Sequence, residues 1–208
     1  MAGGVTWTED VSVAIDFAVR VLEHDGLRVA PFVDHAESDG VLRRFGFDAA
    51  SWLEWVSHLI ANERALASEG AGLESPLRRS PAIDRMGAHI DVLEHPWRSF
   101  PGGPDLQAEL RVLWEELGPG IHNWRHEYLM SALHLRLGPG QQRNLARRLS
   151  VVPGLRTLSL FVVRYRAPVV VPVPPDTCIV ARVADDRGGS TFAAQVVAAA
   201  RALAVDQA

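Results

Sequence analysis

Three short apolar stretches near the C-terminus decide the fold: TLSLFVVRY (157–165), PVVVPV (168–173) and TCIVARV (177–183). They are rich in β-branched residues and are separated by turn residues, which predicts three strands. Both faces of the first stretch are apolar, so we expect a central strand that is covered on both sides. The prolines of the middle stretch donate no ladder hydrogen bonds, which favours a sheet edge or an extended segment outside the sheet.

Helical patterns fill most of the remaining chain. Apolar residues recur there every three or four positions, and turn or capping residues separate the runs. Thr6 to Glu9 has the spacing of a capping box, and Asp48 is expected to cap the strongest helix. The predicted helices span 7–24, 49–68, 82–94, 106–117, 121–137, 141–150 and 191–204, with a further short helix near 39–45.

Two Gly-Pro-Gly motifs, at 118–120 and 138–140, each follow a leucine. Glycine commonly ends a helix, and proline is favoured in the first turn of the next. Both motifs therefore predict tight corners between helices. Together these patterns predict an α+β fold in one domain, 1–208. A mostly helical part, about 1–150, packs with a small three-stranded sheet and a terminal helix, about 151–208.

The chain contains no lysine, and all 21 of its basic side chains are arginine. This excludes mechanisms that need a phosphate-binding, Schiff-base or general-base lysine. Cys178 is the one cysteine, so an internal disulfide is excluded. The N-terminal stretch lacks the features of a secretory signal, and no apolar run is long enough to cross a membrane. We expect a cytoplasmic protein that does not enter the membrane, and the arginine and alanine bias indicates a GC-rich bacterial genome.

The net charge of −4 conceals an asymmetry. Residues 1–100 carry 16 acidic side chains and 9 arginines, whereas residues 101–208 carry 9 acidic side chains and 12 arginines. Within 125–182, nine arginines face two acidic residues. This segment indicates either an anion or nucleic-acid site or pairing with the acidic half of the chain. The arginines predicted to bind a ligand are Arg143, Arg147 and Arg148.

All six tryptophans lie before residue 125, and residues 69–104 are rich in proline and glycine. Long irregular segments inside compact chains are often functional. Trp52 and Trp55 are not easily both accommodated in a core that also takes Trp114 and Trp124. Core packing of the tryptophans is the simpler interpretation, and the alternative places one or two of these rings at a groove or a partner interface. The favoured hypothesis is a non-enzymatic interaction or regulatory module whose partner, another protein or a second copy, binds near 69–104 through Trp52, Trp55 and Trp97.

The alternative is a metal-dependent hydrolase. His122 and His126 are one helical turn apart, and Glu127 could complete a metal site. The order H-x-x-x-H-E matches neither of the known zinc-protease helix motifs, so packed histidines are the simpler interpretation. The segment from His89 to His95 likewise fits no ligand spacing and is interpreted as a solvated helix end. We expect no cofactor.

Overall fold

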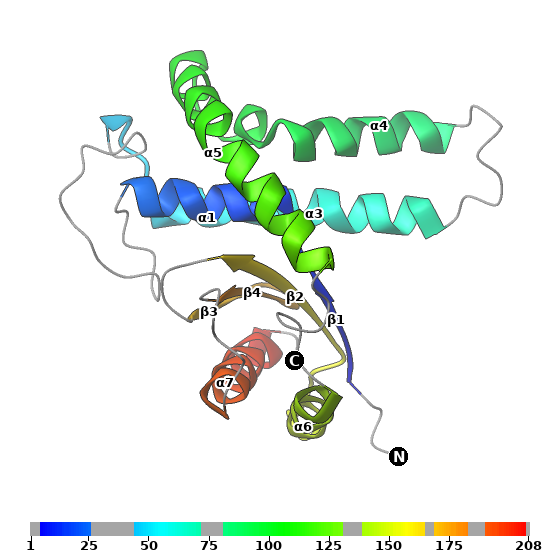
Figure 1. Ribbon diagram of the computed structural model, residues 1–208. Helices are drawn as coiled ribbons and strands as arrows, with labels where there is room; N and C mark the ends of the chain where they lie inside the picture. The colour runs from blue at the N-terminus through cyan, green and yellow to red at the C-terminus, as the bar shows by residue number, and fades with distance from the viewer. Residues whose placement is uncertain are drawn as a thin grey trace. The chain divides into compact units, whose positions relative to one another are not determined.

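The computed structural model describes residues 5–25, 44–71, 81–130, 139–164, 169–182 and 190–206. The chain forms two compact units. The sheet unit comprises Met1–Ser12, Arg28–Val33 and His122–Ala208, and the helical unit comprises Val13–Leu27 and Asp34–Ile121. The predicted α+β class is confirmed, because helices dominate and the C-terminal part folds into a small sheet followed by a helix (Figure 1).

The sheet contains all three predicted strands and one more. Its order is β1 (Thr6–Asp10), β2 (Thr157–Arg164), β4 (Thr177–Arg182) and β3 (Val169–Val173). β1, β2 and β4 are parallel, and β3 runs antiparallel to β4 at the edge. The edge position predicted for the proline-containing middle stretch is therefore confirmed.

The predicted helix 7–24 is wrong in its first part. Residues Thr6–Asp10 form β1, and the helix α1 spans Val13–Asp25. Thr6 to Asp10 pair in parallel register with Thr157 to Phe161, so long-range strand pairing overrides the local capping-box spacing. At the end of β1, the backbone N–H of Val11 donates to the Asp10 carboxylate at 2.7 Å.

One face of β2 packs against two helices of the sheet unit. Leu158, Leu160 and Val162 share a buried cluster with side chains of α6 (Pro139–Leu149) and α7 (Ser190–Asp206). The alternate residues Phe161 and Val163 are also buried, as expected for a central strand. The only thiol of the chain lies in the same cluster, and its burial raises the pKa of Cys178 to about 12. Such a thiol is not a nucleophile at neutral pH.

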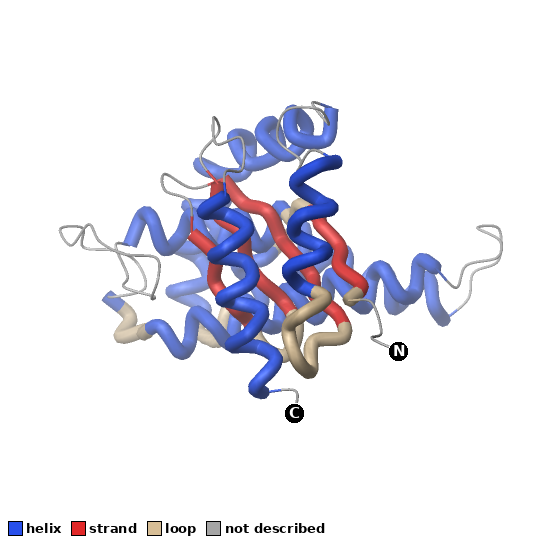
Figure 2. The backbone as a smooth tube through the Cα atoms, turned by 90° about the horizontal axis from the view of Figure 1, so that it is seen from below, coloured by secondary structure: helices blue, strands red, loops and turns tan. Residues whose placement is uncertain are grey.

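The helices α6 and α7 lie on the same face of the sheet (Figure 2). α7 packs on β3 and β4, and α6 packs on α7. The C-terminal end of α7 lies beside the turn that precedes β2, because a Cβ on Gly154 would be 3.4 Å from the carbonyl oxygen of Ala204. Gly154 has a φ of 82°, a conformation that glycine adopts without strain.

The helical unit contains α1, α3 (Ala49–Ala71), α4 (Pro81–Glu94), the 3-10 helix η1 (Pro96–Ser99) and the first part of α5. The predicted helices 49–68 and 82–94 are confirmed as α3 and α4. Asp48 caps α3: its carboxylate accepts hydrogen bonds from the Ser51 backbone N–H and hydroxyl, both at 3.0 Å, and these bonds lower the pKa of Asp48. The short helix predicted near 39–45 lies mostly outside the described residues.

The predicted corner at the first Gly-Pro-Gly motif is wrong. α5 runs without interruption from Pro104 to Met130, with Pro119 in its interior. An interior proline costs about 3 kcal/mol, because it removes one hydrogen bond and crowds the preceding turn. Burial of Leu113, Ile121 and Trp124 on either side, at about 1.5–3 kcal/mol each, offsets this cost.

The second Gly-Pro-Gly motif does precede a helix, since α6 begins at Pro139. The end of the predicted helix 121–137 lies outside the described residues, and its described part belongs to α5. No helix in the described part of the chain is long and apolar enough to cross a membrane.

Candidate functional site

The three tryptophans predicted to bind a partner are buried in the helical unit. Trp52 and Trp55 are 0% exposed and Trp97 is 8% exposed. Residues three apart on a helix are separated by only about 60° around its axis, so both α3 indoles fit on one broad apolar face. Both rings therefore pack in the core, which agrees with the simpler interpretation of the tryptophans and not with the alternative at a surface.

Each buried α3 indole also has a hydrogen-bond acceptor. Trp52 Nε1 donates to the carbonyl oxygen of Ala18 at 2.9 Å. Trp55 Nε1 donates to the carbonyl oxygen of Pro96 and to the Ser99 hydroxyl, both at 3.1 Å. Ring contacts continue the cluster, with Trp55 4.8 Å from Phe100 between ring centroids. These rings have the contacts of core residues, and a partner could reach them only if the helical unit opened.

The first half of the segment between His89 and His95 takes part in a polar contact between α3 and α4. Asn62 is 8% exposed and lies between two histidines. Its Oδ1 is 2.8 Å from Nδ1 of His89, and its Nδ2 is 3.2 Å from Nε2 of His58 and 2.9 Å from the His58 carbonyl oxygen. The amide therefore accepts from His89 and donates to His58, which joins the two helices. Sequence patterns did not single out Asn62: His58 is one turn away on the same helix, but only the pairing of α3 with α4 brings His89 to it.

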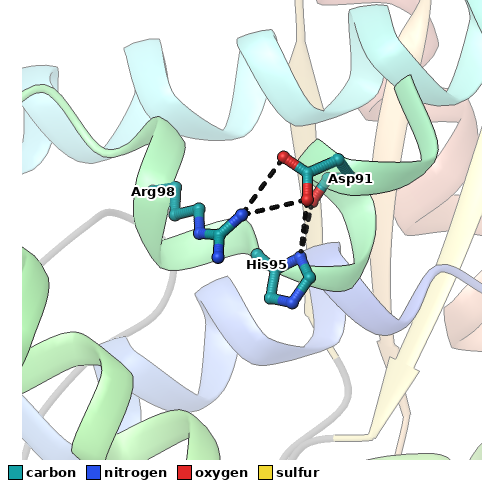
Figure 3. A network of polar contacts seen from close by, with 3 residues as sticks. All are labelled: Asp91, His95 and Arg98. Carbon is teal, nitrogen blue, oxygen red and sulfur yellow. Dashed lines mark hydrogen bonds and ion pairs between the residues drawn. The ribbon is translucent and has the colours of Figure 1, made fainter. Parts of the chain in front are cut away.

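The second half of the segment forms an exposed ionic cluster at the end of α4 (Figure 3). The Asp91 carboxylate is 3.0 Å from Nδ1 of His95, and it accepts from Nη1 of Arg98 at 3.0 and 3.3 Å. The Arg98 guanidinium also lies 5.9 Å from the ring centre of Trp97. The cluster ties α4 to η1 across their junction, and a surface pairing of this kind contributes little stability. The interpretation as a solvated helix end agrees with this second half, whereas His89 contacts the buried Asn62.

The residues of the predicted metal site lie on the last turns of α5. His122, His126 and Glu127 are all exposed. Among the described residues, no group of three or more histidine, cysteine or acidic side chains is placed to hold a metal ion. The helix brings two imidazoles one turn apart, but no described element supplies the third ligand that a zinc site requires.

The three predicted arginines lie on the outer side of α6. Leu145 and Leu149 are fully buried and attach the helix to the core of the sheet unit. Arg143, Arg147 and Arg148 are exposed, and the helix carries no acidic residue. Within the described ranges, no ion pair joins these three arginines to a carboxylate. The structure thus brings three positive charges together on one rigid helix.

The charge asymmetry of the sequence follows the two units. The sheet unit has 12 arginines and 7 acidic residues, a balance of +5, whereas the helical unit has 9 arginines and 18 acidic residues, a balance of −9. The two balances reproduce the net charge of −4. The arginines of α6 therefore belong to a basic unit, although the chain as a whole is acidic.

No protein-family model, curated protein or solved structure matches this chain.

Proposed function

We propose that the chain is a binding protein whose sheet unit holds a nucleic acid, with the outer side of α6 as the contact surface. The observation that carries this proposal is the set of three exposed arginines on α6, with no acidic side chain on that helix. Adjacent like charges repel, and the negative charge of a bound polyanion relieves that repulsion. The counterions condensed on the polyanion are released at the same time, which favours binding. Guanidinium groups also match phosphate oxygens in bidentate geometry.

The mode of attachment of α6 supports the same proposal. Leu145 and Leu149 fix one side of the helix, so Arg143 and Arg147 opposite them, and Arg148 on the flank, project from a backbone that is already ordered. A preorganised surface loses less conformational entropy on binding than a flexible basic tail does. The outer side of α6 is preferred to a surface near 69–104 because Trp52, Trp55 and Trp97 are buried, and residues 72–80 of that segment lie outside the described residues. On the same proposal, the protein acts in the bacterial cytoplasm, where nucleic acids are accessible.

The test is fluorescence anisotropy with labelled 20-nucleotide DNA and RNA, single-stranded and duplex, titrated with the full chain across a range of salt concentrations. We expect binding that weakens steeply as salt increases. A triple variant, Arg143→Gln, Arg147→Gln and Arg148→Gln, should lose about tenfold or more in affinity, and its affinity should depend less steeply on salt concentration.

A second triple variant provides a control with the same total charge. Arg44→Gln, Arg98→Gln and Arg111→Gln remove three exposed arginines from the helical unit, so both variants have a net charge of −7, three below −4. The control should bind like the unchanged protein. The proposal fails if no oligonucleotide binds at low salt, or if the two triple variants lose affinity equally.

A further inference from the structure

The solvent-facing side of α6 has a defined centre. At about 100° per residue, Arg147 lies opposite the buried pair Leu145 and Leu149, with Arg143 and Asn144 within about 60° on either side of it. All three outward residues are exposed. Arg148 lies about 100° around from Arg147, on the flank of the helix. The outward surface of α6 therefore carries two arginines, with the amide of Asn144 on one side of Arg147.

This amide adds a second kind of chemistry to the surface. Phosphate contacts require only positive charge and hydrogen-bond donors. Asparagine instead offers a donor and an acceptor together, which match the N6 and N7 edge of adenine, while arginine matches the O6 and N7 edge of guanine. The one hydrogen bond between these side chains is long, from Arg147 Nη2 to Asn144 Oδ1 at 3.4 Å, so it is readily exchanged for a bond to a base.

The neighbouring helix carries small side chains on part of its exposed surface. Ala194, Ala198 and Ala202 are exposed and spaced four apart on α7, and Val205 is exposed near its C-terminal end. These alanines are much shorter than the arginines of α6. Gly140, one turn before Asn144, leaves open space at the start of α6. Arg201 is exposed on α7, beside the alanine positions.

We infer that α6 enters the major groove of double-stranded DNA, where Asn144, Arg143 and Arg147 contact base edges and Arg148 and Arg201 contact phosphates. This inference rests on the proposed function and specifies the class of nucleic acid. The α6 helix has 11 residues and is about 16 Å long, and a helix with its side chains is about as wide as the major groove. Single-stranded RNA is normally bound by stacking its bases on exposed aromatic rings. The outer residues of α6 are arginines and an amide instead.

The experiment is selection of the full chain on a pool of 20-base-pair duplexes with ten randomised central positions, followed by anisotropy on the enriched duplex. We expect an enriched motif that contains adenine and guanine. Asn144→Ala should reduce the preference at one adenine position by about 5- to 150-fold and leave the salt slope unchanged. Arg148→Gln should weaken binding to all duplexes alike and reduce the salt slope by about 1.

A matched control distinguishes the loss of a base contact at Asn144 from the effect of removing any exposed asparagine side chain from the sheet unit. Asn123 is exposed on α5 within the same unit, and Asn123→Ala should leave both motif and affinity unchanged. Binding of all duplexes without an enriched motif, or tighter binding to single strands, would overturn the groove inference and leave the proposed function in place. Absence of binding to any nucleic acid would overturn both.

Discussion

The two units of the chain use their distinctive side chains in opposite ways. In the helical unit the large aromatic residues turn inward, where Trp52 and Trp55 are fully covered. In the sheet unit the arginines of α6 are exposed, while mostly aliphatic residues, together with Trp124, fill its core. The two units also differ in net charge, which is −9 for the helical unit and +5 for the sheet unit. The comparison indicates that the tryptophans stabilise the protein and that the arginines are the residues available for binding.

The largest expected effect comes from removing a buried indole of the helical unit. Trp55→Ala should lower the free energy of unfolding by about 3–5 kcal/mol, because a large cavity forms and two hydrogen-bond acceptors lose their donor. Chemical unfolding followed by circular dichroism measures the change. Val112→Ala, at a side chain that is 62% exposed, serves as the control and should change stability by less than about 0.5 kcal/mol. A small effect at Trp55 would contradict its place in the core.

The next prediction compares the two sides of α6. Leu145→Ala should cost about 2–5 kcal/mol, since the fully buried side chain attaches the helix to the core. Arg147→Ala on the opposite side should change stability by less than about 0.5 kcal/mol and act on binding instead. The same unfolding measurement tests both variants. Equal losses of stability would show that the arginine also supports the fold, which would weaken the proposed division of roles.

A smaller effect is expected at the amide that joins α3 and α4. Asn62→Ala should destabilise the protein by about 1–3 kcal/mol, because the ring nitrogen of His89 loses its acceptor in a half-buried position. Thermal unfolding of this variant beside His89→Ala and the double variant forms a mutant cycle. Additive effects of the two substitutions would mean that the observed 2.8 Å contact contributes no coupling.

The smallest predicted effect concerns the cap of α3 and its dependence on pH. Hydrogen bonds from Ser51 lower the pKa of Asp48 below 3.8, so the folded protein binds its proton less tightly than the unfolded chain does. The resulting stabilisation is complete above pH 3.8 and is lost as the pH falls through the lowered value. Asp48→Asn keeps a capping oxygen without the charge. The stability difference between the two proteins should therefore shrink toward acid pH in urea titrations, and a difference independent of pH would be inconsistent with this cap.

Local patterns in the sequence were sufficient to predict those elements whose own residues indicate a strand or a helix without reference to distant parts of the chain. The β-branched runs became β2, β3 and β4, and Asp48 with the apolar stripe behind it became α3. β1 was missed because its strand character comes from pairing with β2, at residues about 150 positions away in the sequence. The first Gly-Pro-Gly corner was mispredicted because burial on both sides of Pro119 outweighs the local preference for a break.

The candidate site was also predictable only in part, because residue types can be read from the sequence but their packing cannot. The basic character of Arg143, Arg147 and Arg148 is visible in the sequence, and the structure adds that they share one exposed side of a helix. Asn144 and the small side chains of α7 gain significance only once α6 and α7 are known to lie on the same face of the sheet. Conversely, no sequence pattern distinguishes a tryptophan in a core from one at an interface, and only the packing of Trp52 and Trp55 settled their place.

Arginine footprinting tests the central claim most directly. Because the chain contains no lysine, arginine modification reports the accessibility of every side chain of the lysine and arginine class. The full chain would be treated with phenylglyoxal with and without the duplex pool, digested, and analysed by mass spectrometry. We predict that DNA protects Arg143, Arg147 and Arg148 several-fold and leaves Arg98 and Arg111 of the helical unit unchanged. Protection of the helical unit's arginines, or unchanged modification of α6, would contradict the assignment of binding to the sheet unit.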